Sequence, residues 1–434
     1  MIVLIPIEIS ARELLYKLYL CNQLSKKGFV CYIGYKVHIY KLTKLFKNYI
    51  YLDKGYHKNN SEKIYKIIKE NGGVIYNLDE EGAVEWGNNQ ILNSRYSKEL
   101  FNNSKKVFLW GESQFNRFKN NFVNDNALVT GHPRFELLKK KYHYLYNDSV
   151  KKLNKKHNNY ILFNTNMAFG NNTKGLNFVK ENYGSRLTNI DQIIETDNEK
   201  IKIYVSLIKK LSMIYSGKII FRPHPEEDLN FYIDRFKEYK NVEVIFEGSA
   251  VDWIIGSDLV IHPDCTTGIE SLMLGNVPIS YMPENFDKNA TTELPIKLSK
   301  RFNSEDEILN YLKEINFNHK NISIVGKDKL LFEYFGFNKN STDLIVDEFS
   351  KESNNFKSEN KIPLYYRIRI FVSSLLLRFS FDTETKFLRK KNKGFNLKNI
   401  KLLNSKLILN NKEFESNKLS LISYGLIKIK KKNN

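Results

Sequence analysis

The sequence predicts an α/β protein of two doubly wound domains that face one another across a cleft, followed by a basic C-terminal extension. Apolar runs of strand length alternate with helix-like segments in both halves of the chain, which indicates βαβ units and parallel sheets covered by helices on both faces. A length of 434 residues also exceeds what one ordinary core supports. The predicted parts are residues 1–145, residues 160–330, a closing helix or linker at 331–356 and the extension at 357–434.

In the first predicted domain, strands are expected at residues 2–7, 29–34, 49–52, 74–78, 106–110 and 127–130. Helices are expected at residues 11–26, 36–46, 61–70, 113–119 and 134–141. In the first helix Leu14, Leu15 and Leu18 recur at helical spacing, and Ser61 is expected to cap the third helix. Residues 142–159 are polar, aromatic and basic, which suits a connector between the domains.

The second predicted domain opens with a strand at residues 160–163, followed by the polar loop Asn164, Thr165 and Asn166. Its further strands are expected at residues 218–221, 242–246, 258–261 and 277–281, and its helices at 199–215, 250–255, 269–274 and 304–315. Polar loops follow the strands at their carboxyl ends, where open α/β sheets bind ligands.

Two of these loops suit a phosphate group. Arg222 can donate a bidentate pair of hydrogen bonds, and the prolines on both sides of His224 leave it little backbone freedom. Thr266 and Thr267 stand at the expected start of a helix, where hydroxyls and unpaired N–H groups favour an anion. Taken singly, such a threonine is typical of a helix cap and a lone histidine is more often structural. Together the two loops predict a nucleotide- or phosphate-binding site.

Three consecutive carboxylates, Asp79, Glu80 and Glu81, follow the predicted strand at residues 74–78. Because like charges repel one another, at least one of their pKa values is expected to be raised, which would provide a proton acceptor or a nucleophile. The alternative is a solvated turn that caps the next helix. The position at the end of an interior strand favours a place in the same cleft as the phosphate-binding loops.

Cysteine usage and apolar runs indicate a cytoplasmic protein. Cys21, Cys31 and Cys265 lie far apart and provide neither a metal-ligand spacing nor a disulfide framework. The apolar run at residues 2–7 is too short for a signal peptide. No stretch reaches the roughly 18 apolar residues that a membrane span needs.

The predicted extension carries most of the net charge of +20, because residues 357–434 contain 19 basic and 5 acidic residues. Within it, residues 364–378 form a helix candidate with aromatic and aliphatic residues and interspersed cations. A basic amphipathic helix predicts peripheral contact with the anionic inner face of the cell membrane. The alternative is a small helical addition with a frayed ending rich in Lys and Asn. Nucleic-acid binding is not expected, since the cations lie outside the sheet domains and no RNA- or DNA-binding module is recognisable.

The pairing of Glu80, Glu81 and Gly82 with His224 and Pro225 resembles the acidic-acidic-Gly and His-Pro motifs of bacterial sialyltransferases, polysialyltransferases and Kdo transferases. Further stretches are similar to the bacterial surface carbohydrate biosynthesis proteins, namely residues 77–82, 131–135, 164–166 and 262–271. The resemblance covers roughly residues 1–300. It implies a GT-B glycosyltransferase that makes a surface polysaccharide such as a capsule or lipopolysaccharide. The implied donor is a CMP-linked ulosonic acid such as Kdo or sialic acid, and the implied acceptor is a glycan or a lipid-linked molecule.

The resemblance also implies roles for single residues. Glu80 and Glu81 fall where such enzymes keep their catalytic carboxylate, and Glu81, just before the glycine, would be the nucleophile of a retaining enzyme or the general base of an inverting one. His224 would bind the phosphate of the leaving nucleotide. The implied nucleotide-sugar site comprises Thr165, Asn166, Arg222, His224, Pro225, Thr266, Thr267, Gly268 and Glu270. His132 departs from the family pattern, which favours Asn before that proline, and a loop contact near the hinge is expected for it instead.

Charge development in such a reaction explains the residue types. The sugar gains oxocarbenium character and the leaving group gains negative charge, so a carboxylate and a set of cationic donors match the two. No metal and no cofactor is expected, because the protein supplies the positive groups. Two alternatives stay open: a polyol-phosphate or UDP-sugar transferase on the same fold, and a non-catalytic membrane-associated factor of glycan assembly.

Overall fold

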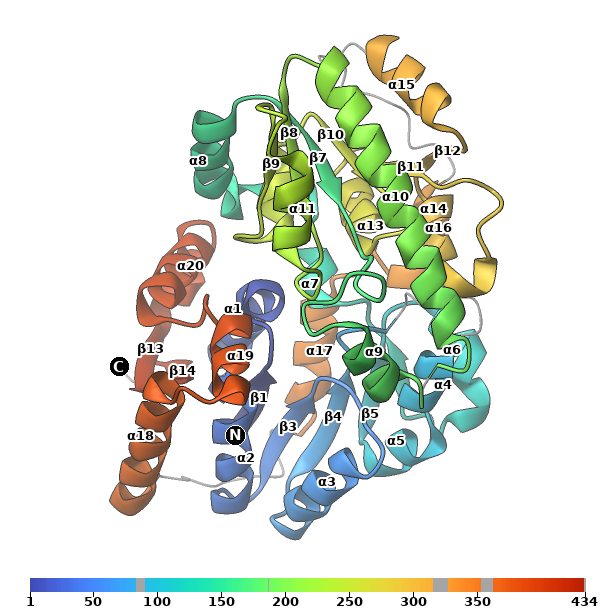
Figure 1. Cartoon of the computed structure of the whole chain (residues 1–434). Helices are drawn as coiled ribbons and strands as arrows, with labels where there is room; N and C mark the ends of the chain where they lie inside the picture. The colour runs from blue at the N-terminus through green and yellow to red at the C-terminus, as the bar shows by residue number, and fades with distance from the viewer. Residues whose placement is uncertain (83–89, 186, 315–326, 353–361, 433–434) are drawn as a thin grey trace. The chain divides into compact units, whose positions relative to one another are not determined.

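The computed structural model describes residues 1–82, 90–185, 187–314, 327–352 and 362–432. They group into two compact units, each with its own sheet (Figure 1). Unit 1 comprises Met1–Ala83, Ser94–Leu137 and Leu331–Asn434, and unit 2 comprises Val84–Asn93 and Leu138–Leu330. The predicted α/β fold class is confirmed. The end of the predicted helix at residue 315 and the predicted boundary at residue 357 lie outside the described residues.

Unit 1 has an eight-stranded sheet in the order β13-β14-β2-β1-β3-β4-β5-β6. The strands that pair in parallel are β1 (Ile2–Ile7), β2 (Val30–Tyr35), β3 (Tyr49–Asp53), β4 (Val74–Leu78), β5 (Lys106–Leu109) and β6 (Ala127–Val129). All six residues of β1 are buried, as helices on both faces require. The strand order reverses between β1 and β3, so the switch point of this sheet lies at the carboxyl ends of these two strands.

The C-terminal hairpin of β13 (Asn417–Ser423) and β14 (Leu426–Lys431) completes this sheet. β14 runs antiparallel to β2, with Ile427 opposite Ile33 and Ile429 opposite Cys31. Both isoleucines are fully buried, because they alternate with lysines and so share one face of the strand. The frayed ending considered from the sequence is therefore wrong for these residues.

The helices of unit 1 come from both ends of the chain. They are α1 (Ser10–Lys26), α2 (Lys36–Leu45), α3 (Asn60–Glu70), α5 (Lys98–Asn103), α6 (Glu112–Phe118), α7 (Pro133–Glu136), α17 (Ser341–Ser350), α18 (Leu364–Phe379), α19 (Thr383–Lys391) and α20 (Leu397–Leu409). The short helix α4 (Gln90–Arg95) spans the boundary between Asn93 and Ser94. A further helix, α16 (Lys327–Phe335), spans the boundary at Leu331. Helix α3 begins at Asn60, one residue earlier than predicted, so its N-cap residue is Asn59 rather than Ser61.

Unit 2 has an all-parallel sheet in the order β12-β11-β10-β7-β8-β9. Its strands are β7 (Tyr160–Asn164), β8 (Lys218–Arg222), β9 (Val242–Val244), β10 (Leu259–His262), β11 (Ile279–Tyr281) and β12 (Lys300–Phe302). This is the order of a Rossmann sheet, whose switch point lies between its first and fourth strands, here β7 and β10. The helices are α8 (Asn147–His157), α9 (Leu176–Tyr183), α10 (Ile190–Ile214), α11 (Leu229–Phe236), α12 (Ala250–Gly256), α13 (Thr266–Met273), α14 (Glu293–Lys297) and α15 (Glu305–Glu314).

One sequence prediction about the region after β6 is wrong, and the predicted connector has structure that the sequence analysis did not place. The helix predicted at residues 134–141 ends at Glu136, and a 3-10 turn follows at Lys140–Leu145. The predicted connector contains the helix α8, whose buried His157 packs its ring 5.2 Å from that of Trp253 in α12. This helix is stabilised by a contact distant in sequence, which its Lys- and Asn-rich surface does not reveal.

None of the helices among the described residues is both long enough and apolar enough to cross a bilayer.

Candidate functional site

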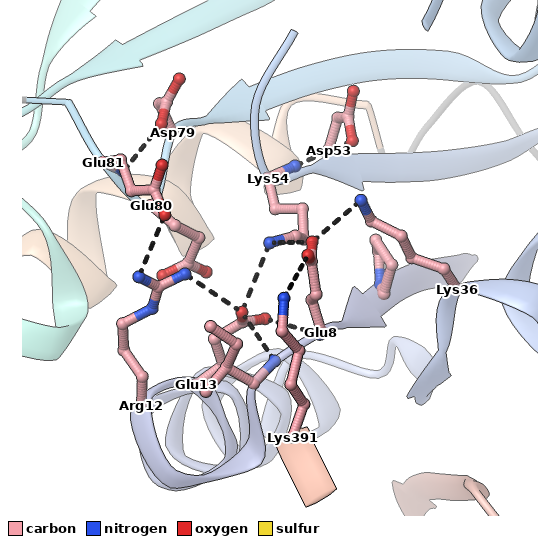
Figure 2. Close-up of polar contacts among 12 residues, drawn as sticks. Glu8, Arg12, Glu13, Lys36, Asp53, Lys54, Asp79, Glu80, Glu81 and Lys391 are labelled. Atoms are coloured by element: carbon pink, nitrogen blue, oxygen red, sulfur yellow. Dashed lines mark hydrogen bonds and ion pairs between the residues drawn. The ribbon is translucent and has the colours of Figure 1, made fainter. Parts of the chain in front are cut away.

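Ion pairs fill the switch point of the unit 1 sheet. Figure 2 shows the carboxylates of Glu8, after β1, and Glu13, in α1, both pointing toward the amine of Lys54, after β3. Lys54 Nζ lies 2.9 Å from Glu8 Oε2 and 3.4 Å from Glu13 Oε1. Lys36 Nζ lies 3.0 Å and Lys391 Nζ 3.7 Å from the Glu8 carboxylate. Burial opposes ionisation of Glu8, but Lys54 and Lys36 hold its pKa far below the ordinary value.

Glu80 is a buried anion within the same network. Its Oε1 lies 3.0 Å from Lys17 Nζ, which also lies 2.7 Å from Glu13 Oε2, and it accepts a hydrogen bond from the hydroxyl of Tyr16. Burial by itself would raise the pKa of Glu80. Lys17 and the other neighbouring positive groups outweigh this effect and hold the pKa well below the usual range. With only 1% of the residue exposed, Glu80 stabilises the unit rather than facing a substrate.

Glu81 has a different environment, because 57% of its side chain is exposed. Its two carboxylate oxygens each lie 3.3 Å from a guanidinium nitrogen, one of Arg12 and one of Arg95. Desolvation opposes ionisation, but Arg12 and Arg95 hold the pKa of Glu81 below its ordinary value. The predicted raised pKa is therefore wrong for Glu80 and Glu81, since nearby cations outweigh the repulsion between carboxylates. An exposed and ionised carboxylate suits a nucleophile or a base.

The turn that presents Glu81 is held on both sides. Asp79 accepts hydrogen bonds from Arg95 Nε at 2.7 Å and Nη2 at 2.5 Å, and its carbonyl accepts one from Trp110 Nε1 at 2.8 Å. At Gly82 an added Cβ would lie 2.7 Å from the hydroxyl of Tyr96 and 3.0 Å from the ring of Trp110. The glycine of the acidic motif is thus needed for packing, and the turn holds Glu81 in one position.

In unit 2 one buried carboxylate joins the loops after β7 and β8. Glu227 Oε1 accepts hydrogen bonds from Thr165 Oγ1 at 2.7 Å, Met167 N at 3.0 Å and His224 N at 2.9 Å. Its Oε2 accepts one from the hydroxyl of Tyr232 at 2.5 Å. The hydroxyl of Thr165 therefore helps to hold the loop in position. The sequence predicted only a contact with the ligand for this residue.

Buried polar atoms gather at the carboxyl ends of β7 and β8, beside the switch point of the unit 2 sheet. Arg222 packs over the ring of Phe246, 5.1 Å from its centroid, and donates a 3.0 Å hydrogen bond to the carbonyl of Gly248. Arg222 Nε, Asn166 Oδ1 and both side-chain polar atoms of Asn164 are buried and meet no hydrogen-bond partner within the described structure. Because buried polar groups are almost always paired, this group of atoms makes the carboxyl ends of β7 and β8 a candidate site for a polar ligand.

The residues at the start of α13 differ in exposure and in their contacts. Thr266 is exposed, whereas the hydroxyl of Thr267 donates to Cys265 Sγ at 3.2 Å. A Cβ on Gly268 would lie 2.1 Å from His262 Nε2, so this glycine makes room for a buried histidine. Glu270, one turn further on, is half-buried. Of the residues predicted at this helix, Thr266 has the exposure that contact with an anion needs.

A buried charge set supports the loop before α13. Asp264 Oδ2 lies 3.0 Å from Lys200 Nζ and accepts a hydrogen bond from Thr292 N at 2.8 Å. Lys200 also lies 3.3 Å from Asp197, whose carboxylate accepts from Phe169 N at 3.1 Å. Burial raises the pKa of Asp197 to about 7, despite the opposing effect of Lys200.

Three His-Pro pairs follow strands and share one local geometry. In His132, His224 and His262 the ring Nδ1 accepts a backbone N–H from two or three residues further on, at 3.0, 3.3 and 3.2 Å. This hydrogen bond leaves the proton on Nε2 in the neutral ring. His262 Nε2 lies 2.8 Å from Ser299 Oγ and is buried. His132 is also buried, with its Nε2 3.7 Å from Glu80 Oε2, so it contacts the turn after β4 from inside unit 1. His224, by contrast, is partly exposed and suits a ligand contact.

The structure brings together part of the predicted site. The loops that carry Thr165, Asn166, His224 and Thr266 meet within unit 2, since Asn166 Nδ2 lies 3.4 Å from the carbonyl of Asp264 and Thr165 and His224 share Glu227. Pro225 is exposed beside them. Glu80 and Glu81 belong to unit 1.

Sequence reasoning missed five residues that shape these sites: Arg12, Arg95, Lys200, Glu227 and Asp264. Glu227 and Asp264 stand one or two residues after the His-Pro pairs of unit 2, so their position was an available signal. The three cations come from helices outside the predicted motifs, and no local pattern points to them.

We expect Glu227→Ala to destabilise unit 2 by at least about 3 kcal/mol, because it leaves several buried donors unpaired. Chemical denaturation followed by far-UV circular dichroism measures the change. Glu226→Ala is the matched control, since the Glu226 carboxylate is half-buried and accepts a 3.4 Å bond from Tyr183. Equal stabilities of the two variants would contradict the role assigned to Glu227.

The buried His132 predicts a loss of stability in mild acid. Burial lowers its pKa from 6.5 to about 3, so between these pH values the unfolded chain binds a proton that the folded unit does not. The free energy of unfolding therefore falls as the pH drops, by up to about 1.4 kcal/mol per pH unit from this group. Denaturation between pH 6.5 and 4 should show a shallower slope for His132→Asn than for the natural protein. Identical slopes would contradict a neutral imidazole at this position.

No protein-family model matches this chain, and no curated protein does. Among solved structures, it is similar to the UDP-GlcNAc 2-epimerase of Methanocaldococcus jannaschii, with a TM-score of 0.50 and 13% identity over 81% of this chain and 99% of that one. It is also similar to a putative UDP-N-acetylglucosamine 2-epimerase of Listeria monocytogenes (TM-score 0.48, 10% identity, 83% and 99% covered). The wall teichoic acid polymerase TagF gives a TM-score of 0.42 and 12% identity over 74% and 86% of the two chains. At such identities the likeness concerns the fold alone: the chain has two Rossmann-like α/β units of the GT-B type.

Proposed function

We propose that this protein is a glycosyltransferase of bacterial surface polysaccharide biosynthesis. It transfers a sugar from a nucleotide-activated donor, a CMP-linked ulosonic acid such as Kdo or sialic acid, to a glycan or lipid-linked acceptor. The observation that carries the proposal is the group of buried, unpaired polar atoms of Asn164, Asn166 and Arg222 beside the switch point of a Rossmann-ordered sheet. A sheet of this order binds nucleotides at that point.

In the proposed donor site the phosphate meets positive and N–H groups. His224 donates from Nε2, because its Nδ1 already accepts the N–H of Glu226. Arg222 adds a cationic charge, and the exposed Thr266 contributes its hydroxyl at the start of α13. These groups stabilise the negative charge that develops on the leaving nucleotide.

The proposed chemistry breaks the bond between the anomeric carbon and a phosphate oxygen and forms a bond from that carbon to an acceptor oxygen. The proton of the acceptor hydroxyl passes to a base. Glu81 is the carboxylate we assign to the sugar, since it is exposed and ionised whereas Glu80 is buried among cations. In a retaining reaction it attacks the anomeric carbon, and in an inverting one it takes the acceptor proton.

A panel of nucleotides tests the donor class. We expect CMP to raise the unfolding temperature more than UDP, GDP or CDP, because a ligand that binds the folded protein stabilises it. The increase should be smaller in His224→Ala and unchanged in His57→Ala, which removes an exposed histidine of unit 1. A preference for UDP or CDP would move the proposal to a UDP-sugar or polyol-phosphate transferase, and no response to any nucleotide would reject it.

For the reaction itself, Glu81→Gln should reduce the rate of nucleotide release in the presence of acceptor by about a thousandfold. Its stability should stay within about 1 kcal/mol, because ion pairs of exposed groups contribute little. Loss of one charge-assisted hydrogen bond in His224→Ala should slow the reaction about tenfold to a hundredfold. Glu112→Gln is the control, since this carboxylate is 55% exposed in α6 of the same unit. Full activity of Glu81→Gln would remove Glu81 from the mechanism.

A further inference from the structure

Helix α18 leaves a continuous apolar face uncovered. Eight of its large apolar side chains are between 38% and 73% exposed: Leu364, Tyr365, Ile368, Phe371, Val372, Leu375, Leu376 and Phe379. Two of its side chains, Ile370 and Ser374, are buried. Figure 1 shows α18 lying beside β13 at the edge of the unit 1 sheet. A soluble helix normally turns its apolar face inward, so α18 has the opposite arrangement.

The exposed residues form a single stripe. At about 100° per residue, the eight side chains fall within an arc of about 140°. Ile370 and Ser374 lie on the opposite side of the helix. The apolar stripe of α18 is therefore not the margin of a packed face but a separate face that points away from the unit.

Arginines border the apolar stripe of α18 on both sides. On the same helical projection Arg367 and Arg378 fall along one edge of the stripe and Arg369 along the other. All three arginines are exposed, and residues 364–379 contain no acidic side chain. The next helix adds the exposed cations Lys386 and Lys390, and the intervening Phe381 is 83% exposed.

We propose that the apolar stripe of α18 docks on an anionic lipid bilayer, with the helix lying in the plane of the membrane surface. An apolar stripe bordered by cations matches acyl chains below and anionic headgroups beside them. A second copy of the chain suits this face less well, because it would bring arginines against arginines. The length of 16 residues is sufficient for a helix in the interface and too short for a span.

The docking helix is fixed to the rest of unit 1. Arg389 of α19 donates to the carbonyls of Leu377 and Arg378 at 3.3 and 2.8 Å, which holds the end of α18. At the end of α19, Lys391 contacts Glu8 of the ion-pair network. Membrane docking through α18 would thus hold the unit that carries the network at the bilayer. The inference does not depend on the proposed reaction.

Co-sedimentation of the full chain with vesicles tests the proposal. We expect vesicles of phosphatidylglycerol and phosphatidylcholine to bind the protein more than tenfold more tightly than vesicles of phosphatidylcholine alone. Phe371→Asp combined with Leu375→Asp should reduce binding at least tenfold, because it places two charges on the stripe. Arg367→Gln, Arg369→Gln and Arg378→Gln together should reduce binding about tenfold or more, and added salt should weaken the binding of the natural protein.

Matched controls separate the stripe from general effects. Met213→Asp combined with Ile214→Asp adds the same charges to exposed apolar positions of unit 2. Lys151→Gln, Lys152→Gln and Lys155→Gln remove three exposed cations from α8. Both controls should bind as the natural protein does, with circular dichroism confirming that all variants are folded. Failure of the natural protein to bind anionic vesicles would overturn the proposal. So would equal binding by the α18 variants, or a dimer in solution that the Phe371→Asp, Leu375→Asp variant dissociates.

Discussion

The pairing of Lys17 with Glu13 and Glu80 is the constraint on which unit 1 depends. The three side chains are almost fully buried and come from α1 and from the end of β4. Buried charges are costly unless each has a partner, and removing one member leaves the others uncompensated. The helix α1 must therefore stay in one register against the sheet, and the turn at Asp79–Glu81 must stay against the helix. The exposed carboxylate at the end of that turn, Glu81, is therefore held in a defined position.

This arrangement explains why two adjacent glutamates, Glu80 and Glu81, have different environments. Glu80 points into the unit, where Tyr16 and Lys17 both contact its Oε1. Glu81 points outward, where two arginines hold it without covering it. The cations that would stabilise any bound anion here are already paired with carboxylates. The unit 1 switch point is consequently filled by its own charges, whereas the corresponding point of unit 2 is lined mainly by uncharged polar side chains.

Unit 2 uses a related device with one carboxylate. Glu227 accepts bonds from two strand-end loops and so holds Thr165 and His224 in fixed relation. The recurring His-Pro pairs have a local explanation. The proline ends the strand, and the histidine Nδ1 satisfies an N–H of the turn that follows. In two of the three pairs the ring is buried and structural, and His224 is the exception because its loop lies at the surface of the unit.

The sequence by itself determined the fold class, most strand positions and the loops that carry polar residues, because alternation of apolar runs and turn residues is a local property. It also marked Glu81 and His224 through their positions at strand ends. Only the tertiary structure decided that Glu80 is buried and Glu81 exposed, since the answer depends on Arg12, Lys17 and Arg95, which approach from helices outside the acidic turn. For the same reason the C-terminal lysines could not be placed from composition: β14 forms its hydrogen bonds with β2, some 400 residues earlier, and no local pattern records such a partner.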